Sequence, residues 1–202
     1  MLQNNELRIT VWYMDSAHLS WDLFVIVFFV VIVAYSLIIG RDNTLKVILG
    51  TYVAAFAADA MGNLFGSHMA SSEFFIKLLQ FLQLGTESEA IVFVKVLIFV
   101  MMVILFAVKG AFAVETADDR SGAVKIILSS LYAVMSAGLI ISVILVFVSG
   151  YSFVTGTGGT GAVFAEIYEE SKLVNSMIKN SYLWFSIPAL SFLIHSLYSK
   201  KA

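Results

Sequence analysis

The stretch Leu23–Ile39, LFVIVFFVVIVAYSLII, decides the fold because it contains no charged residue and no proline. At ~1.5 Å per residue, a helix of this length covers roughly 26 Å, enough for a thin or locally adapted bilayer. Hydrocarbon cannot satisfy open backbone groups, so such a run must be a helix or part of a closed barrel. Its apolar residues are continuous rather than alternating, and we therefore expect a helix. Trp12, Tyr13 and Trp21 precede it, as in an interfacial aromatic belt.

The composition of the whole chain agrees with a membrane protein. Of its 202 residues, 60% are hydrophobic and 13% are charged, whereas soluble domains carry about 25% charged residues. The formal net charge of −2 is too small to indicate an acidic or basic partner, and the basic residues are scattered, so we expect no nucleic-acid partner. The absence of cysteine excludes disulfides and thiolate metal sites.

Further apolar runs follow the first span. Three of them cover about Lys46–Phe65, Ala90–Ala113 and Ala123–Ser149, and a run of marginal length, Tyr182–Tyr198, contains Pro188. The last run is either a short fifth span or an interfacial helix, and we favour the span. The sequence thus predicts an all-α, polytopic transmembrane helical bundle of four to five spans.

Shorter elements are expected between the spans. Glu73–Leu84 is predicted to be a short interfacial helix, and Gly150–Gly161, GYSFVTGTGGTG, to be a flexible linker. Ala162–Asn180 has apolar residues at helical spacing with a polar back, which indicates a water-facing amphipathic helix. The expected organisation is an extracytoplasmic N-terminal segment at 1–22, a four-span bundle at 23–149, the extracytoplasmic linker and amphipathic helix at 150–181, and the fifth span or interfacial helix at 182–202.

The basic residues orient these spans, because positive charge in short loops favours the cytoplasmic side. If the first loop lies inside, the inner side holds most of the 12 basic residues: Arg41, Lys46, Lys109, Arg120, Lys125, Lys200 and Lys201. The N-terminus is therefore predicted outside, together with the segment after the fourth span. Five spans place the C-terminus inside, and four place it outside.

Small residues recur at every fourth position along the second span. They are Gly50, Ala54, Ala58, Gly62 and Gly66. This spacing places them on one helix face, where the backbone of another helix can approach closely. We interpret the face as a helix–helix contact. Ser129, Ala133 and Ala137, with Gly138 and Ser142 nearby, offer a second packing face on the fourth span.

Two charged residues lie at similar depth inside predicted spans. Asp59 is roughly 9 Å from the outer end of the second span, counted at ~1.5 Å per residue, and Lys95 lies in the third span. Ionisable groups in hydrocarbon are costly and are functional candidates by default. We expect the two to form an ion pair that acts either as an ion or proton relay or as a device that fixes helix register. Independent snorkelling of the two side chains is the third interpretation.

No pattern of catalytic, metal or cofactor-binding residues is found. A phosphate-binding loop requires Lys and then Ser or Thr after its last glycine, whereas Ala162-Val163 follow the GTGGTG of Gly156–Gly161. His18, His68 and His195 do not have metal-ligand spacing. There is also no nucleophile elbow. We therefore expect a protein that is not an enzyme and holds no cofactor.

Several short motifs together resemble the colicin V production protein family of bacterial inner-membrane proteins. They are Asp22 at the start of the first span, the Gly40-Arg41 turn, the Ala-rich second span LGTYVAAFAADAMGNLF, and Glu170-Ser171-Lys172-Leu173-Val174 near the end. The resemblance covers roughly Trp21–Asn180. It implies a place in the bacterial inner membrane and a role in export or envelope homeostasis. Related four-span modules anchor extracytoplasmic proteases, which implies that the segment after the fourth span lies outside.

Two functional hypotheses follow. The leading one is a non-enzymatic integral membrane scaffold or assembly protein that contacts lipid and other membrane proteins and forms homo-oligomers. It depends on the two small-residue faces, the outer amphipathic segment and the lack of an active-site pattern. The alternative is a small channel or transporter with Asp59 and Lys95 in its pathway.

Overall fold

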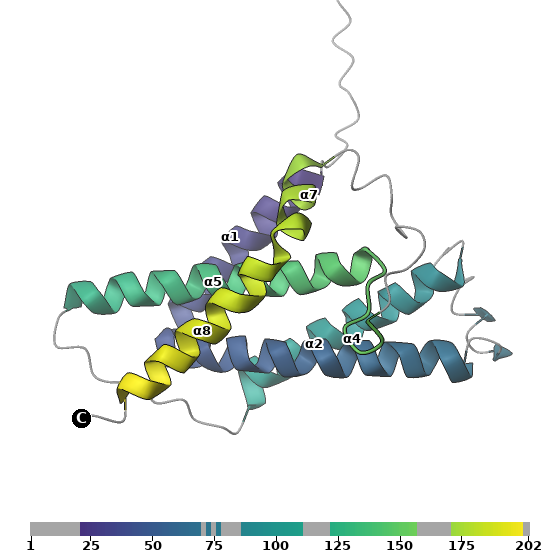
Figure 1. Cartoon of the computed structure of the whole chain (residues 1–202), viewed down its shortest axis with the longest axis horizontal. Helices are drawn as coiled ribbons and strands as arrows, with labels where there is room; N and C mark the ends of the chain where they lie inside the picture. The colour runs from purple at the N-terminus through teal and green to yellow at the C-terminus, as the bar shows by residue number, and fades with distance from the viewer. Residues whose placement is uncertain are drawn as a thin grey trace, which may run out of the picture.

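A computed structural model describes residues 21–69, 72–73, 76–77, 86–110, 122–156 and 171–199. Every regular element within these ranges is an α-helix, which confirms the predicted all-α class (Figure 1). The helices are α1 (Trp21–Ile39), α2 (Arg41–Met69), α4 (Glu87–Lys109), α5 (Gly122–Val148), α7 (Lys172–Lys179) and α8 (Ser181–Ser199). The predicted helix Glu73–Leu84 and residues 157–170 lie largely or wholly outside the described residues.

Four of the helices, α1, α2, α4 and α5, are long and apolar enough to cross a membrane. The chain is therefore a polytopic helical membrane protein, as its sequence predicts. The last helix, α8, continues through Pro188 for 19 residues. The fifth span stays a prediction.

A single glycine joins α1 to α2. Gly40 has φ +82°, a left-handed conformation that other residues rarely adopt. The Thr44 hydroxyl lies 2.9 Å from the carbonyl oxygen of Ser36 and 2.8 Å from that of Gly40, and its one proton is shared between them, which links the end of α1 to the start of α2. The second helix starts at Arg41, five residues before the expected start of the second span, and contains the whole of that span.

The centre of the bundle is α5, which packs against α1, α2 and α8. In Figure 1, α1 and α8 both cross α5, and α4 crosses behind α2 at an angle. The core contains Leu139, Val143 and Phe147 of α5 together with Ile48 of α2 and Phe99 of α4. Much of the outward surface of α1 and α4 is apolar and exposed, as expected for helices that face lipid.

The small-residue face of α2 lies against α4 of the same chain. A Cβ atom added at Gly50 would lie 2.7 Å from Phe106 Cβ, and one at Gly66 would lie 2.6 Å from Ile91 Cδ1. Ala54 and Ala58, between these glycines, are fully buried. The second face is also covered within the chain: Ala133 and Ala137 are buried, and Trp184 of α8 lies against Gly138. Neither face is therefore left open for a second copy, and the homo-oligomer stays a prediction.

The segment after α5 differs from the predicted flexible linker. Its described part, Gly150–Gly156, folds back onto the bundle, where Ser152 is buried. The ring of Phe153 lies 5.7 Å from that of Phe147 and 5.4 Å from that of Phe185, measured between centroids. The linker prediction is wrong here because Ser152 and Phe153 find polar and apolar partners inside the bundle.

The predicted amphipathic helix Ala162–Asn180 is present in its described part as α7, which starts later than Ala162 and does not have its apolar face toward water. Ser171 is extended (φ −110°, ψ 107°) and caps α7, so this helix begins only at Lys172. Ser171 Oγ accepts a hydrogen bond from the Val174 N–H at 3.0 Å. Val174 and Met177 are buried in a cluster with residues of α1 and α5. The apolar face of α7 therefore packs on the bundle.

Candidate functional site

The candidate site begins at Asp59, which α2 directs toward α4 and which is 0% exposed. Gly62 lies almost one turn further along α2, and a Cβ atom there would lie only 2.2 Å from Lys95 Cγ. The missing side chain at Gly62 thus leaves the space in which Lys95 of α4 crosses α2. Because of this close crossing, the Lys95 ammonium reaches the Asp59 carboxylate.

The structure brings Asp59 and Lys95 together as a buried ion pair. Lys95 Nζ lies 2.6 Å from Asp59 Oδ1, and the two side chains are 6% and 0% exposed. Charges removed from water carry a desolvation cost, which close pairing and additional hydrogen bonds must offset. The distance between Lys95 Nζ and Asp59 Oδ1 meets the requirement for close pairing.

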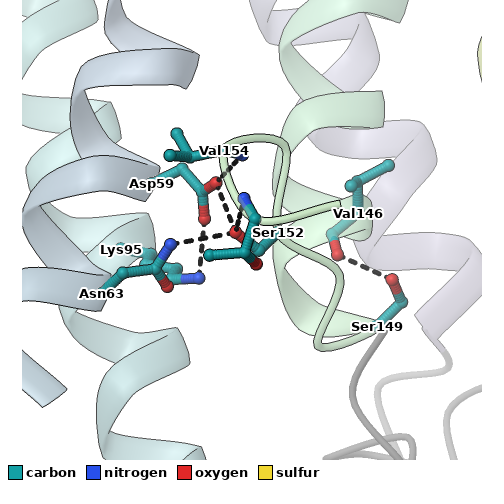
Figure 2. Close-up of polar contacts among 8 residues, drawn as sticks. Asp59, Asn63, Lys95, Val146, Ser149, Ser152 and Val154 are labelled. Atoms are coloured by element: carbon teal, nitrogen blue, oxygen red, sulfur yellow. Dashed lines mark hydrogen bonds and ion pairs between the residues drawn. The ribbon is translucent and has the colours of Figure 1, made fainter. Parts of the chain in front are cut away.

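The segment after α5 supplies the additional hydrogen bonds. The Ser152 hydroxyl and the Val154 N–H both donate to Asp59 Oδ2, each at 2.8 Å (Figure 2). Ser152 Oγ in turn accepts from Asn63 Nδ2 at 2.9 Å and from the Thr155 N–H at 3.2 Å. A serine hydroxyl has one donor and two acceptor positions, so Ser152 is fully satisfied.

Aromatic rings surround the loop that carries Ser152. The ring of Phe153 contacts that of Phe56 of α2 at 5.9 Å, in addition to Phe147 of α5 and Phe185 of α8. These rings keep the polar groups in an apolar environment, where the attraction between opposite charges is stronger than in water. The site thus joins α2, α4 and the loop after α5 through one carboxylate.

A second carboxylate fixes α7 to the start of α1. Ser171 Oγ donates a hydrogen bond to Asp22 Oδ1, which also accepts from the Leu173 N–H at 3.2 Å. An anionic side chain at a helix N-terminus satisfies free N–H groups and interacts favourably with the helix dipole. Asp22 therefore holds α7 beside the first turn of α1. Sequence reasoning named Asp22 and Ser171 only through the family resemblance and did not foresee their contact.

Sequence reasoning missed three members of the Asp59 site, namely Asn63, Ser152 and the backbone N–H of Val154. The sequence did indicate that Asp59 needs further donors. A carboxylate has about four acceptor positions, and a single lysine fills only some of them. Of the histidines, His68 pairs with Ser67 at the end of α2, and His18 lies outside the described residues. No group of three or more potential metal-ligating side chains occurs within the described ranges.

The contacts of Asp59 attach the loop after α5 to α2 and α4. Both carboxylate oxygens of Asp59 accept hydrogen bonds. The hydroxyl of Ser152 already makes three hydrogen bonds. Comparison of the chain with protein-family models, with curated proteins and with solved structures finds no match.

Proposed function

We propose that this chain is a non-enzymatic membrane scaffold that presents the segment after α5 to other membrane proteins. The observation that carries the proposal is the use of two carboxylates, Asp59 and Asp22, to attach the two ends of that segment to membrane helices. Each attachment combines a side-chain and a backbone donor, so it fixes the path of the chain as well as one residue.

The three hydrogen bonds that Asp59 accepts support a structural role for the ion pair. A relay requires a group that exchanges protons or ions with water, whereas Asp59 is fully buried and accepts three hydrogen bonds. Hydrogen-bonded polar networks in an apolar environment make a structure more rigid and favour one arrangement. A fixed arrangement of an outer segment is what a scaffold needs.

The family resemblance adds a second line of support. Asp22 and Ser171-Lys172-Leu173, two of its motifs, lie in contact although 149 positions separate Asp22 from Ser171. A physical link between distant motifs gives a reason for both to be present. The proposal therefore includes the colicin V production role, in export or envelope homeostasis, and the bacterial inner membrane with the N-terminus outside.

Photocrosslinking in the native membrane tests the scaffold. A photoreactive residue replaces Val154, whose side chain is 54% exposed next to the Asp59 site, and the matched control replaces Val30 of α1, which is 58% exposed. We expect one discrete protein product from position 154 and only lipid products from position 30. The yield at position 154 should fall when Asp59→Leu releases the loop. Only lipid products at position 154 would contradict the proposal.

A small channel or transporter is the second candidate, favoured by the presence of an ion pair within two spans. Flux of protons and alkali cations into proteoliposomes separates the two functions. The scaffold predicts the same flux with protein and with empty vesicles. A transporter predicts flux that disappears in a folded Asp59→Asn/Lys95→Met variant.

A further inference from the structure

The exposed face of α7 carries positive charge. Lys172 and Lys179 are both exposed, and they are seven residues apart, which is nearly two helical turns and places them on one side. The sequence of α7, KLVNSMIK, contains no acidic residue. Among the described residues, neither lysine forms a hydrogen bond or an ion pair with another side chain. Within the described residues, the two ammonium groups therefore have no acidic partner.

The neighbours of α7 define its depth in the membrane. Its apolar residues share a cluster with Val25, Phe28 and Phe29 of α1. These lie four to eight residues beyond Trp21, which is about 6–12 Å along the helix. Figure 1 shows α7 beside the first turns of α1, at the end of the bundle where α8 begins. With Trp21 placed at headgroup level as an interfacial aromatic residue, this position on α1 corresponds to the boundary between headgroups and acyl chains, where amphipathic helices lie.

Exposed aromatic residues at the same end of the bundle mark the same boundary. Trp21 begins α1, and Tyr182 lies in the first turn of α8. Tryptophan and tyrosine are enriched at headgroup level, where one side of the ring is apolar and the other polar. Lysine side chains at this level extend their ammonium groups toward the headgroups.

From the charge, the depth and the free face of α7, we infer that Lys172 and Lys179 bind the phosphate groups of anionic phospholipids. The two lysines are about 10.5 Å apart along the helix axis, so each meets its own phosphate. The apolar face of α7 is already used by Val174 and Met177, which leaves the lysine face for the lipid. Lipid binding there holds α7 against α1 and α5, in addition to the Asp22 contact. The inference does not depend on the proposed scaffold role.

Crosslinking to a lipid tests this inference. The full-length protein is reconstituted in phosphatidylcholine vesicles that contain phosphatidylglycerol with a photoreactive headgroup, and crosslinked peptides are mapped by mass spectrometry. Wild type should be labelled on α7. Each Lys→Gln change at 172 or 179 should lower that labelling about fivefold, and both together about 25-fold, because a basic residue near an anionic surface contributes about this factor.

Three controls keep the result interpretable. Lys172→Arg/Lys179→Arg should retain the labelling, since it keeps both charges. Lys125→Gln, at the exposed start of α5, should leave labelling of α7 unchanged. Added salt should reduce the labelling of wild type. The inference is overturned if wild type is not labelled on α7, if Lys172→Gln/Lys179→Gln is labelled like wild type, or if phosphatidylcholine with the same photoreactive group labels α7 equally. It is also overturned if the lysine face crosslinks to a protein in native membranes.

Discussion

The ion pair between α2 and α4 gives the sharpest quantitative expectation for stability. The change Lys95→Met removes the ammonium group at similar side-chain length and leaves Asp59 with its two donors, Ser152 and the Val154 N–H. The change Asp59→Leu leaves the buried ammonium and both of these donors without their acceptor. Breaking a buried pair by removing one partner costs about 3–5 kcal/mol. Each orphaned neutral donor adds about 1–3 kcal/mol.

The two single variants should therefore differ. We expect Lys95→Met to lose about 3 kcal/mol, because the remaining carboxylate keeps two hydrogen bonds. Asp59→Leu should lose about 5 kcal/mol or more, because the ammonium of Lys95 has no acceptor left. The double variant Asp59→Asn/Lys95→Met keeps a side-chain oxygen for the Val154 N–H and contains no charge. Relative to the sum of Asp59→Asn and Lys95→Met, it should recover about 2 kcal/mol or more.

Reversible unfolding in mixed micelles of a mild and a denaturing detergent, followed by circular dichroism, measures these free energies. Ser67→Ala, at the exposed end of α2, serves as a surface control and should change stability by no more than about 0.5 kcal/mol. The reasoning is refuted if the losses of Asp59→Asn and Lys95→Met add to that of the double variant within about 0.5 kcal/mol. Additivity would mean that the two side chains do not depend on each other.

Three further outcomes follow from other parts of the structure. Gly62→Ala should destabilise the protein by about 3 kcal/mol or more in the same unfolding assay, because its Cβ displaces the stem of Lys95, while Gly66→Ala meets only the flexible end of Ile91 and should cost less than half as much. Gly40→Ala should cost about 1–2 kcal/mol because of its positive φ, whereas Gly122→Ala, with open space around it, should be neutral; a similar loss in both would contradict this. Asp22→Asn should raise the hydrogen-exchange rate of the first amides of α7 in nanodiscs without changing that of α5, and unchanged α7 protection would show that the Asp22 contact does not hold this helix.

The spans and the ion pair follow from local sequence, whereas the rest of the site does not. An uncharged run such as Leu23–Ile39 identifies a membrane helix by its transfer free energy alone. Asp59 and Lys95 are placed at one depth by residue counting, because neighbouring spans run in opposite directions through a layer of fixed thickness. Ser152 is 93 positions from Asp59, and its loop resembles a linker in composition. Only the tertiary fold brings the two together.

The same limit explains the errors at the end of the chain. Helical spacing over Ala162–Asn180 predicts one helix, but Ser171 prefers the extended conformation in which its hydroxyl caps α7 and bonds to Asp22. Periodicity identifies an apolar face and not the surface that covers it. Val174 and Met177 are covered by α1 and α5, and no pattern within α7 distinguishes that environment from water.

The order in which the partners of Asp59 are synthesised has a consequence for biogenesis. Lys95 is made 36 residues after Asp59, and Ser152 is made 93 residues after it. At about 5–20 residues per second, the nascent chain carries an unpaired acid for about 2–7 s until Lys95 emerges, and for about 5–19 s until Ser152 emerges. During this interval α2 carries a polar side chain without its partners, and we expect the helix to stay beside the insertion machinery. Ribosome-bound chains that end before Ser152 should therefore be held at the insertion site longer than full-length chains, and Asp59→Leu should shorten that delay.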